Sequence, residues 1–189
     1  EVIRLRVARK LVGRSAYFTA AYWVDGLLVD TGCAHTARQL SQAVKDWHVT
    51  QIVNTHSHED HIGANAELRA LCGCPARAHA LALPILANPR LQPLQPYRHL
   101  CWGRPRPSTA EAVGDWVETE HHRFRVIATP GHSPDHIALF EPEQGWLFSG
   151  DTDLPKKFGL KAHKRIPLWN GAIECRLYCY RVVSGKLEP

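Results

Sequence analysis

The stretch THSHEDHIGA, residues 55–64, holds three histidines, a glutamate and an aspartate in ten positions. Imidazole nitrogen and carboxylate oxygen are the ligands that Zn²⁺ and neighbouring divalent metals prefer in proteins. His56 and His58 are two residues apart, so at an extended strand end both side chains point to one side, and Asp60 continues that side. His61 then faces back toward them from the start of a helix. The spacing predicts a metal site rather than a polar loop, with Glu59 pointing away from it.

Two later segments carry side chains of the same chemistry. PGHSPDH at 130–136 contains His132 and His136, and SGD at 149–151 contains Asp151. Both segments adjoin apolar strand-like runs, and loops at strand ends are where a sheet-based fold gathers its functional side chains. The sequence therefore offers six candidate ligands, namely His56, His58, Asp60, His61, His132 and Asp151.

The order of these motifs resembles the metallo-beta-lactamase superfamily of binuclear hydrolases. The resemblance covers about residues 3–155, and it is specific for fold and metal rather than for substrate. The stretches that carry it are HSHEDH at 56–61, TPGHSPDHI at 129–137, FSGD at 148–151 and, upstream, LLVDTG at 27–32.

Carried over position by position, the resemblance implies two metal ions, expected to be Zn²⁺, with Fe or Mn as alternatives. It assigns the first ion to His56, His58 and His132, and the second to Asp60, His61 and a bridging Asp151. It also implies that Asp30 hydrogen-bonds a ligand imidazole and fixes its tautomer; an ordinary turn cap before Gly32 is an equal alternative. His136 is expected to support the ligands or the loop.

The implied chemistry is hydrolysis by a hydroxide that two ions about 3.5–4 Å apart share. Asp60 can orient this nucleophile and shuttle its proton, which makes it the predicted catalytic residue. The bridging Asp151 disfavours β-lactam hydrolysis, so a thioesterase of the glyoxalase II kind with a small anionic substrate is the first prediction. A phosphodiesterase or endoribonuclease of the same fold is the second.

Two further alternatives remain open. A persulfide dioxygenase with a single iron keeps a very similar HxHxDH stretch, and a non-catalytic metal-binding remnant is the other alternative. The remnant is considered because the family supplies one more histidine from a loop that should begin about where the chain reaches Pro189. His163 is the only histidine after Asp151 and is predicted as a substitute ligand.

The elements that must position these residues follow from periodicity and turn residues. Strands are predicted at 3–8, 17–24, 26–30, 49–55, 77–80, 124–129, 136–141 and 146–149, with a hairpin turn at Asp25–Gly26. Helices are predicted at 34–47, at 62–71 with Asp60 as N-cap, and at 173–183. These elements and the resemblance predict an α+β fold, an αββα sandwich of two mixed sheets in one domain over 1–189, atypical or truncated in its last part.

Composition sets the remaining limits. The chain has 189 residues, 44% of them apolar and 22% charged, and no apolar run long enough for a membrane span. The net charge is +5. Part of the positive charge is concentrated in a Pro-rich segment at about 88–110, the predicted lid, which contains Arg90, Arg98, Arg104 and Arg106. This lid is predicted to grip an anionic substrate, with nucleic acid the less favoured partner. The six cysteines are predicted to be reduced and mostly buried, which favours a cytoplasmic location. The oligomeric state is left open.

Overall fold

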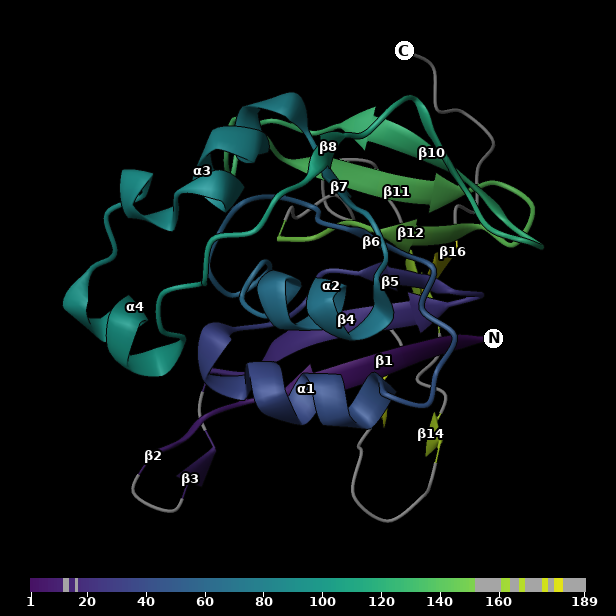
Figure 1. Cartoon of the computed structure of the whole chain (residues 1–189). Helices are drawn as coiled ribbons and strands as arrows, with labels where there is room; N and C mark the ends of the chain where they lie inside the picture. Colours follow the sequence, from purple (N-terminus) through teal and green to yellow (C-terminus); the bar gives the residue numbers. More distant parts are fainter. Residues whose placement is uncertain are drawn as a thin grey trace.

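Two β-sheets pack face to face, and helices cover the outer face of the larger sheet (Figure 1). The computed structural model describes residues 1–11, 14–15 and 17–151, together with the backbone of four short strands in the remaining segment. Those strands are β13 (Lys161–His163), β14 (Pro167–Leu168), β15 (Cys175–Arg176) and β16 (Cys179–Arg181).

The larger sheet has six strands in the order β1-β4-β5-β6-β7-β8. They are β1 (Val2–Val7), β4 (Thr19–Val24), β5 (Leu27–Val29), β6 (Gln51–Val53), β7 (Ala76–Ala78) and β8 (Glu111–Ala112). The pairs β1–β4 and β4–β5 are antiparallel, whereas β5, β6, β7 and β8 are parallel, so the sheet is mixed. The predicted hairpin turns at Asp25 and Gly26, whose φ values of 49° and 84° suit a tight turn between twisted strands. A small hairpin of β2 (Lys10–Leu11) and β3 (Arg14–Ser15) follows β1.

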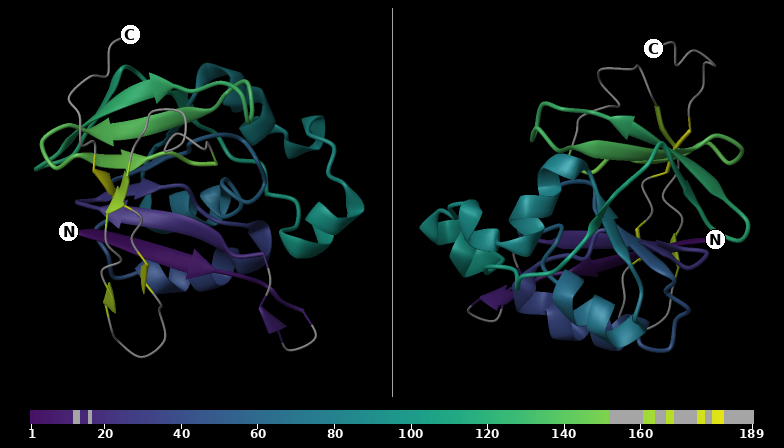
Figure 2. Two further views of the ribbon diagram at one scale, coloured as in Figure 1. Left: turned by 180° about the vertical axis from the view of Figure 1, so that it is seen from behind. Right: turned by 45° about the horizontal axis from the view of Figure 1, so that its top comes forward.

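The smaller sheet has four strands in the order β12-β11-β10-β9, and these four are antiparallel throughout. They are β9 (Trp116–Glu118), β10 (Arg123–Ala128), β11 (Ile137–Glu141) and β12 (Trp146–Phe148). The second view in Figure 2 shows this sheet as a separate layer above the larger one. The αββα prediction thus holds for the two sheets and for the helices on the larger sheet.

Each face of the larger sheet has its own apolar core. Leu28 and Ile52 point toward α1 (Ala37–Val44) and α2 (Asn65–Cys72), while Val29 and Val53 point toward the smaller sheet. This alternation follows from the two-residue period of a strand. Both faces are buried, so β5 and β6 are apolar at nearly every position, as parallel strands between two layers must be. The two cores hold the strand ends, and thus the functional loops, at fixed positions.

The segment between β7 and β8, residues 79–110, contains the Pro- and Arg-rich stretch at about 88–110 for which the sequence predicts a lid, and the whole segment is called the lid below. It contains η2 (Ala80–Ala82), α3 (Leu83–Ala87), η3 (Pro89–Leu91) and α4 (Pro96–Cys101), and α4 stands at the side of the molecule in Figure 1. Arg104 Nη1 donates to the carbonyl oxygens of Pro89 at 2.6 Å and Gln92 at 3.2 Å. Arg104 therefore stabilises the lid through hydrogen bonds to two of its backbone carbonyl groups.

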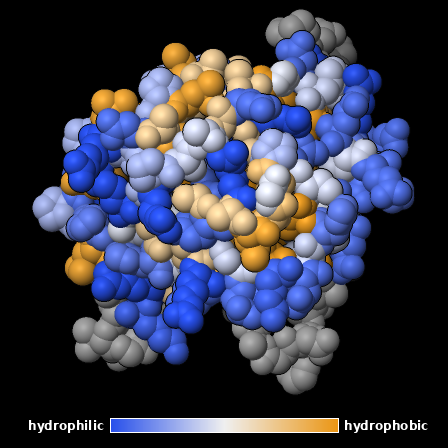
Figure 3. All heavy atoms as spheres, in the orientation of Figure 1, coloured by the Kyte–Doolittle hydropathy of each residue, from blue (hydrophilic) through white to orange (hydrophobic). Residues whose placement is uncertain are grey.

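The face seen in Figure 1 is mostly hydrophilic, and Figure 3 shows its hydrophobic side chains in small separate patches. Isolated apolar patches of this kind are normal on a protein surface. Within the described residues, no helix combines the length and the apolar character needed to cross a bilayer.

Two predicted details of the helices are wrong. The second helix begins at Asn65, with Ala64 as its N-cap, because residues 60–63 form turns in which the N–H of His61 donates to the carbonyl of His58. Asp60 therefore caps no helix. The predicted helix at 173–183 contains β15 and β16 instead, in keeping with the strand formers in that segment.

The prediction of reduced thiols is wrong for one pair of cysteines. Cys72 and Cys74 form a disulfide across Gly73, which adopts a left-handed conformation with φ 64° at the end of α2. This turn brings the two Cα atoms to 5.2 Å, within the normal range for a disulfide. Cys33 and Cys101 are free and buried, as predicted.

Replacing Gly63 by alanine is expected to lower the free energy of unfolding by at least about 3 kcal/mol. A Cβ at this position would lie 2.2 Å from the carbonyl carbon of Cys33 and 2.3 Å from the nitrogen of Ala34. These are backbone atoms that cannot rotate away. Denaturant melts measure the loss, and Gly114→Ala is the control because a Cβ there meets nothing within 4 Å. Equal stability of the two variants would contradict this close packing of the two loops.

Candidate metal centre

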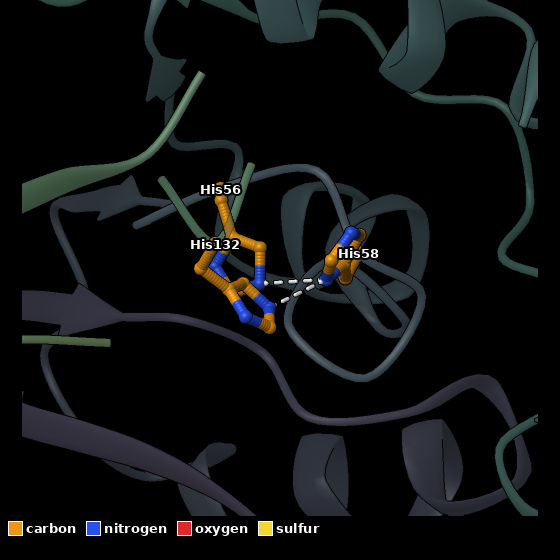
Figure 4. Close-up of side chains that lie close together, drawn as sticks. All are labelled: His56, His58 and His132. Atoms are coloured by element: carbon orange, nitrogen blue, oxygen red, sulfur yellow. Dashed lines mark hydrogen bonds between the residues drawn. The ribbon is translucent and has the colours of Figure 1, made fainter. Parts of the chain in front are cut away.

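Three histidines converge from two loops of the molecule. His56 and His58 lie in the loop after β6, and His132 lies in the loop between β10 and β11. His58 Nδ1 is 3.1 Å from His56 Nε2 and 2.9 Å from His132 Nε2, as Figure 4 shows. In a tetrahedral zinc site with Zn–N bonds of about 2.0–2.1 Å, ligand nitrogens lie about 3.3 Å apart. Two of the three nitrogen–nitrogen distances are therefore close to that spacing, and all three nitrogens lie within 4.8 Å of one another.

The remaining candidate ligands lie beside this group. His61 Nε2 is 3.2 Å from Asp151 Oδ1 and 3.8 Å from Asp60 Oδ2, and Asp151 Oδ2 is 3.5 Å from His132 Nε2. Ligand-type atoms of His56, His61 and Asp151 also lie within 4.8 Å of one another. The structure thus brings all six predicted residues together, with Asp151 between the two groups.

Asp30 holds the ring of His61. Asp30 Oδ2 is 2.7 Å from His61 Nδ1, while Thr55 donates to the same carboxylate from its backbone N at 2.7 Å and from its Oγ1 at 2.8 Å. Asp30 itself is buried in a left-handed backbone conformation, with φ 59°. Such a conformation is uncommon for residues other than glycine and tends to occur at functional sites. The resemblance implies that Asp30 hydrogen-bonds a ligand imidazole, and the imidazole that Asp30 contacts in the structure is that of His61.

A buried polar network fixes the backbone at His61. The carbonyl oxygen of His61 accepts from Thr31 N at 2.8 Å, Thr31 Oγ1 at 3.1 Å and Asn54 Nδ2 at 3.1 Å. Asn65 Oδ1 in turn accepts from Thr31 Oγ1 at 2.7 Å. The side chains of Thr31, Asn54 and Asn65 are fully buried and all hydrogen-bonded, as buried polar groups need to be. No local sequence pattern predicts this network.

His136 and Gly150 place Asp151. His136 is 1% exposed, its Nδ1 lies 2.7 Å from Thr129 Oγ1, and its Nε2 accepts from the backbone N of Asp151 at 3.2 Å. Gly150 has φ 52°, and a Cβ on it would lie 2.6 Å from His136 Nε2. Only glycine lets the chain after β12 pass this close to the imidazole. His136 therefore supports a candidate ligand, in line with its predicted role.

Asp135 is a supporting residue that the sequence did not reveal. It is 3% exposed, and its Oδ2 accepts from the backbone N of Ser57 at 2.8 Å. This bond ties the loop that carries His132 to the loop that carries His56 and His58. The two loops are therefore fixed relative to each other.

The protonation states of His56, His58 and Asp151 suit a divalent cation, whereas His61 would have to lose a proton to bind one. Burial, together with neighbouring imidazoles, lowers the pKa of His56 far below its usual range and that of His58 to about 4, so both have free lone pairs at neutral pH. Burial would raise the pKa of Asp151, but the hydrogen bond and charge of His61 lower it to about 2. Burial would lower the pKa of His61, yet Asp30 and Asp151 raise it. Neutral imidazole and ionised carboxylate are the forms that bind metal.

The lid contacts the loop between β6 and α2, residues 54–64, through an arginine. This loop is called the metal loop below. Glu59 turns away from the imidazoles, as predicted, and is 1% exposed; Arg98 Nε donates to its Oε1 at 2.6 Å. Arg106 Nη1 similarly donates to Glu67 Oε1 at 3.3 Å. Arg98 and Arg106, like Arg104, bind groups of this chain in the structure, so the idea that the basic lid grips a substrate gains no support from these three side chains.

The predicted role of His163 is not tested by the structure. This residue is the last of β13 and pairs with Cys179 of β16, but its side chain lies outside the described residues. Its assignment as a ligand stays a prediction.

A sandwich of two sheets with histidines and aspartates on the loops at its strand ends has the architecture of a metallohydrolase. The sequence profile of the metallo-beta-lactamase superfamily matches residues 15–171, and the chain belongs to this superfamily. The fold agrees with solved structures. The B3 metallo-beta-lactamase BLEG-1 superimposes with a TM-score of 0.60 at 24% identity, covering 78% of this chain and 71% of that one.

Relatives in sequence include two bacterial hydrolases. The chain is 34% identical over 111 residues to hydroxyacylglutathione hydrolase of Rhodospirillum rubrum, covering 56% of this chain and 34% of the relative. The same enzyme of Pseudomonas putida strain F1 is 33% identical over 127 residues, 66% of this chain and 41% of the relative. An uncharacterized protein of Aquifex aeolicus is 30% identical over 129 residues, 67% of this chain and 59% of the relative. The chain therefore spans well under two thirds of each of these relatives.

Proposed function

We propose that this chain provides the catalytic core of a zinc-dependent thioester hydrolase of the hydroxyacylglutathione hydrolase type. The observation that carries the proposal is the position of Asp151, whose two oxygens lie 3.2 Å from His61 Nε2 and 3.5 Å from His132 Nε2. A carboxylate between two groups of imidazoles suits a centre that shares one ligand between two ions. The sequence similarity to hydroxyacylglutathione hydrolases supports the same substrate class.

The donor atoms fit two zinc ions. The three convergent nitrogens of His56, His58 and His132 form one set. We assign His61, Asp151 and Asp60 to the second set, in which His61 Nε2 lies 3.2 Å from Asp151 Oδ1 and 3.8 Å from Asp60 Oδ2. Histidine nitrogen and carboxylate oxygen are common zinc ligands. Zinc takes four or five ligands and each set supplies three, so each ion would have room for water or substrate. When bound, such ions supply a water of lowered pKa and polarise the thioester carbonyl.

The protein's own groups then complete the reaction. The Asp60 carboxylate can take the proton of the attacking water as the water oxygen bonds to the carbonyl carbon. The carbon–sulfur bond breaks, the proton held by Asp60 passes to the leaving sulfur, and the products are the free acid and the thiol, with Asp60 again a carboxylate. The Asp30 carboxylate, 2.7 Å from His61 Nδ1, holds the His61 ring, and the Arg98 guanidinium lies 3.9 Å from Asp60 Oδ1.

A cavity of about 340 Å³ opens beside these carboxylates, large enough for a small organic substrate. Asp60, His61 and Asp151 lie at one part of its lining, and Phe18, Tyr22 and Phe148 supply aromatic surface. An acyl chain can pack on these rings while its carbonyl faces the metal ligands.

Elemental analysis and a substrate panel test the proposal together. We expect about two zinc per chain after reconstitution, and turnover of an acyl-glutathione thioester well above that of a bis-aryl phosphodiester, a β-lactam or a lactone. Chelation should remove the activity, and added zinc should restore it. Preferred turnover of the phosphodiester would favour the alternative phosphodiesterase. One tightly bound iron and no hydrolysis would favour the persulfide dioxygenase, and at most one weak zinc would favour the non-catalytic remnant.

A further inference from the structure

The lid reaches the metal loop through Arg98, a side chain of α4 that is largely shielded from solvent. Arg98 lies on α4, 39 positions after Glu59, and its side chain is 24% exposed, whereas Tyr97 and Leu100 on the same helix are more than half exposed. The inward position of a long cationic side chain requires anionic partners, because an unpaired buried charge is strongly unfavourable. Two carboxylates of the metal loop meet this requirement.

The first partner is Glu59. This residue lies between the candidate ligands His58 and Asp60, and only 1% of its side chain is exposed. Its Oε1 accepts from Arg98 Nε at 2.6 Å, while no hydrogen bond within the described residues reaches its Oε2. A buried carboxylate with one cationic partner depends on that partner, so the pair fixes α4 against the metal loop.

The second partner is Asp60 itself. Arg98 Nη2 lies 3.9 Å from Asp60 Oδ1, and His61 Nε2 lies 3.8 Å from Asp60 Oδ2. No hydrogen bond from a described residue reaches Asp60 Oδ1. This carboxylate therefore has the Arg98 guanidinium near one oxygen and the ligand cluster near the other, and the guanidinium charge favours an orientation in which Oδ1 faces α4.

Other contacts hold the end of α4 independently of Arg98. Trp102 Nε1 donates to the carbonyl of Tyr17 at 3.2 Å, and the backbone N of His35 donates to the carbonyl of Trp102 at 3.1 Å. The Arg98 guanidinium also lies 5.4 Å from the centre of the Trp102 ring. The lid should therefore stay attached when Arg98 is replaced, so the effect on Asp60 can be measured in a folded protein.

We propose that Arg98 is a positioning residue, which fixes α4 on Glu59 and orients Asp60 toward the metal centre. Only the expected effect on kcat rests on the proposed hydrolase function. Its structural part, the docking of the lid on the metal loop, stands on the contacts above. In this arrangement the lid takes part in the geometry of the site rather than only covering it.

Arg98→Gln tests the proposal, with Arg90→Gln as a matched control on an exposed arginine of the same lid. We expect Arg98→Gln to raise the hydrogen-exchange rates of amides 97–103 at least tenfold and to lower kcat on the thioester at least tenfold. KM and zinc content should change little. Arg98→Lys, which keeps the charge, should recover part of both losses, and Arg90→Gln should change neither.

A double variant separates docking from orientation. If Arg98 acts through its pair with Glu59, Glu59→Gln combined with Arg98→Gln should lower kcat no further than the stronger single variant. Multiplied losses would overturn this coupling. Exchange rates and kcat equal to those of Arg90→Gln would overturn the whole proposal.

The absorption spectrum of the Co²⁺-substituted protein gives a readout that needs no substrate. A change of the ligand-field bands in Arg98→Gln and not in Arg90→Gln supports the orienting role, and identical spectra overturn it. If the unmodified protein hydrolyses no thioester, the proposed function fails, while hydrogen exchange and the Co²⁺ spectra still decide the role of Arg98.

Discussion

Replacing Asp60 by asparagine is expected to lower kcat for thioester hydrolysis by about 10²–10⁴-fold, the usual contribution of a positioned general base. The amide has nearly the same shape as the carboxylate, and its oxygen can still face a metal ion, but it cannot take a proton from water. Burial raises the pKa of the Asp60 carboxyl, which makes the carboxylate a stronger base than an exposed aspartate. The measurement is kcat of the zinc-loaded variant.

The control for Asp60→Asn is Asp46→Asn, the same chemical change on a side chain that is 84% exposed at the surface. Zinc content is measured in parallel. If turnover stays unchanged at full zinc content, Asp60 has no proton-transfer role. If turnover and zinc are lost together, Asp60 acts as a ligand only.

The candidate ligands were predictable because their signals are local. The HxHxDH spacing puts four of them on one strand end and the turn after it, and short motifs mark His132 and Asp151. The strands were predictable for a similar reason, since apolar runs such as β5 and β6 are continuous and end at turn residues. Each of these signals requires only neighbours in sequence.

The supporting residues were not predictable because their partners are distant. Asp135 holds a backbone group 78 positions earlier, and Arg98 holds Glu59 from 39 positions later. The neighbouring residues in sequence do not show which charged group each of them will contact, so the sequence alone predicts substrate contacts for the arginines of the lid. Residues 173–183 have both a helical spacing of apolar residues and a high content of strand-forming residues. They contain strands because β16 pairs with β13 and β15 pairs with β14, and sequence periodicity does not show this pairing.

Replacing Asp30 by asparagine is expected to weaken binding of the second zinc by about 10–100-fold, the usual effect of losing a group that orients a metal ligand. The backbone N of Thr55 donates to Asp30 Oδ1 at 2.7 Å, so the amide oxygen of the variant should remain there. Its NH₂ group then faces His61 Nδ1, which lies 2.7 Å from Oδ2 in the present structure. His61 must accept at Nδ1 and carry its proton on Nε2.

The proton would then sit on the atom that faces Asp60 and Asp151, and a protonated nitrogen cannot bind a metal. Asp135→Asn is the matched control. It is also a buried aspartate beside the site, but among the described residues the hydrogen bond to its carboxylate comes from the backbone N of Ser57, and asparagine can keep that bond. Zinc competition titrations should therefore show about one tightly bound ion in Asp30→Asn and two in Asp135→Asn. Two tightly bound ions in both variants would mean that the tautomer of His61 does not control the second site.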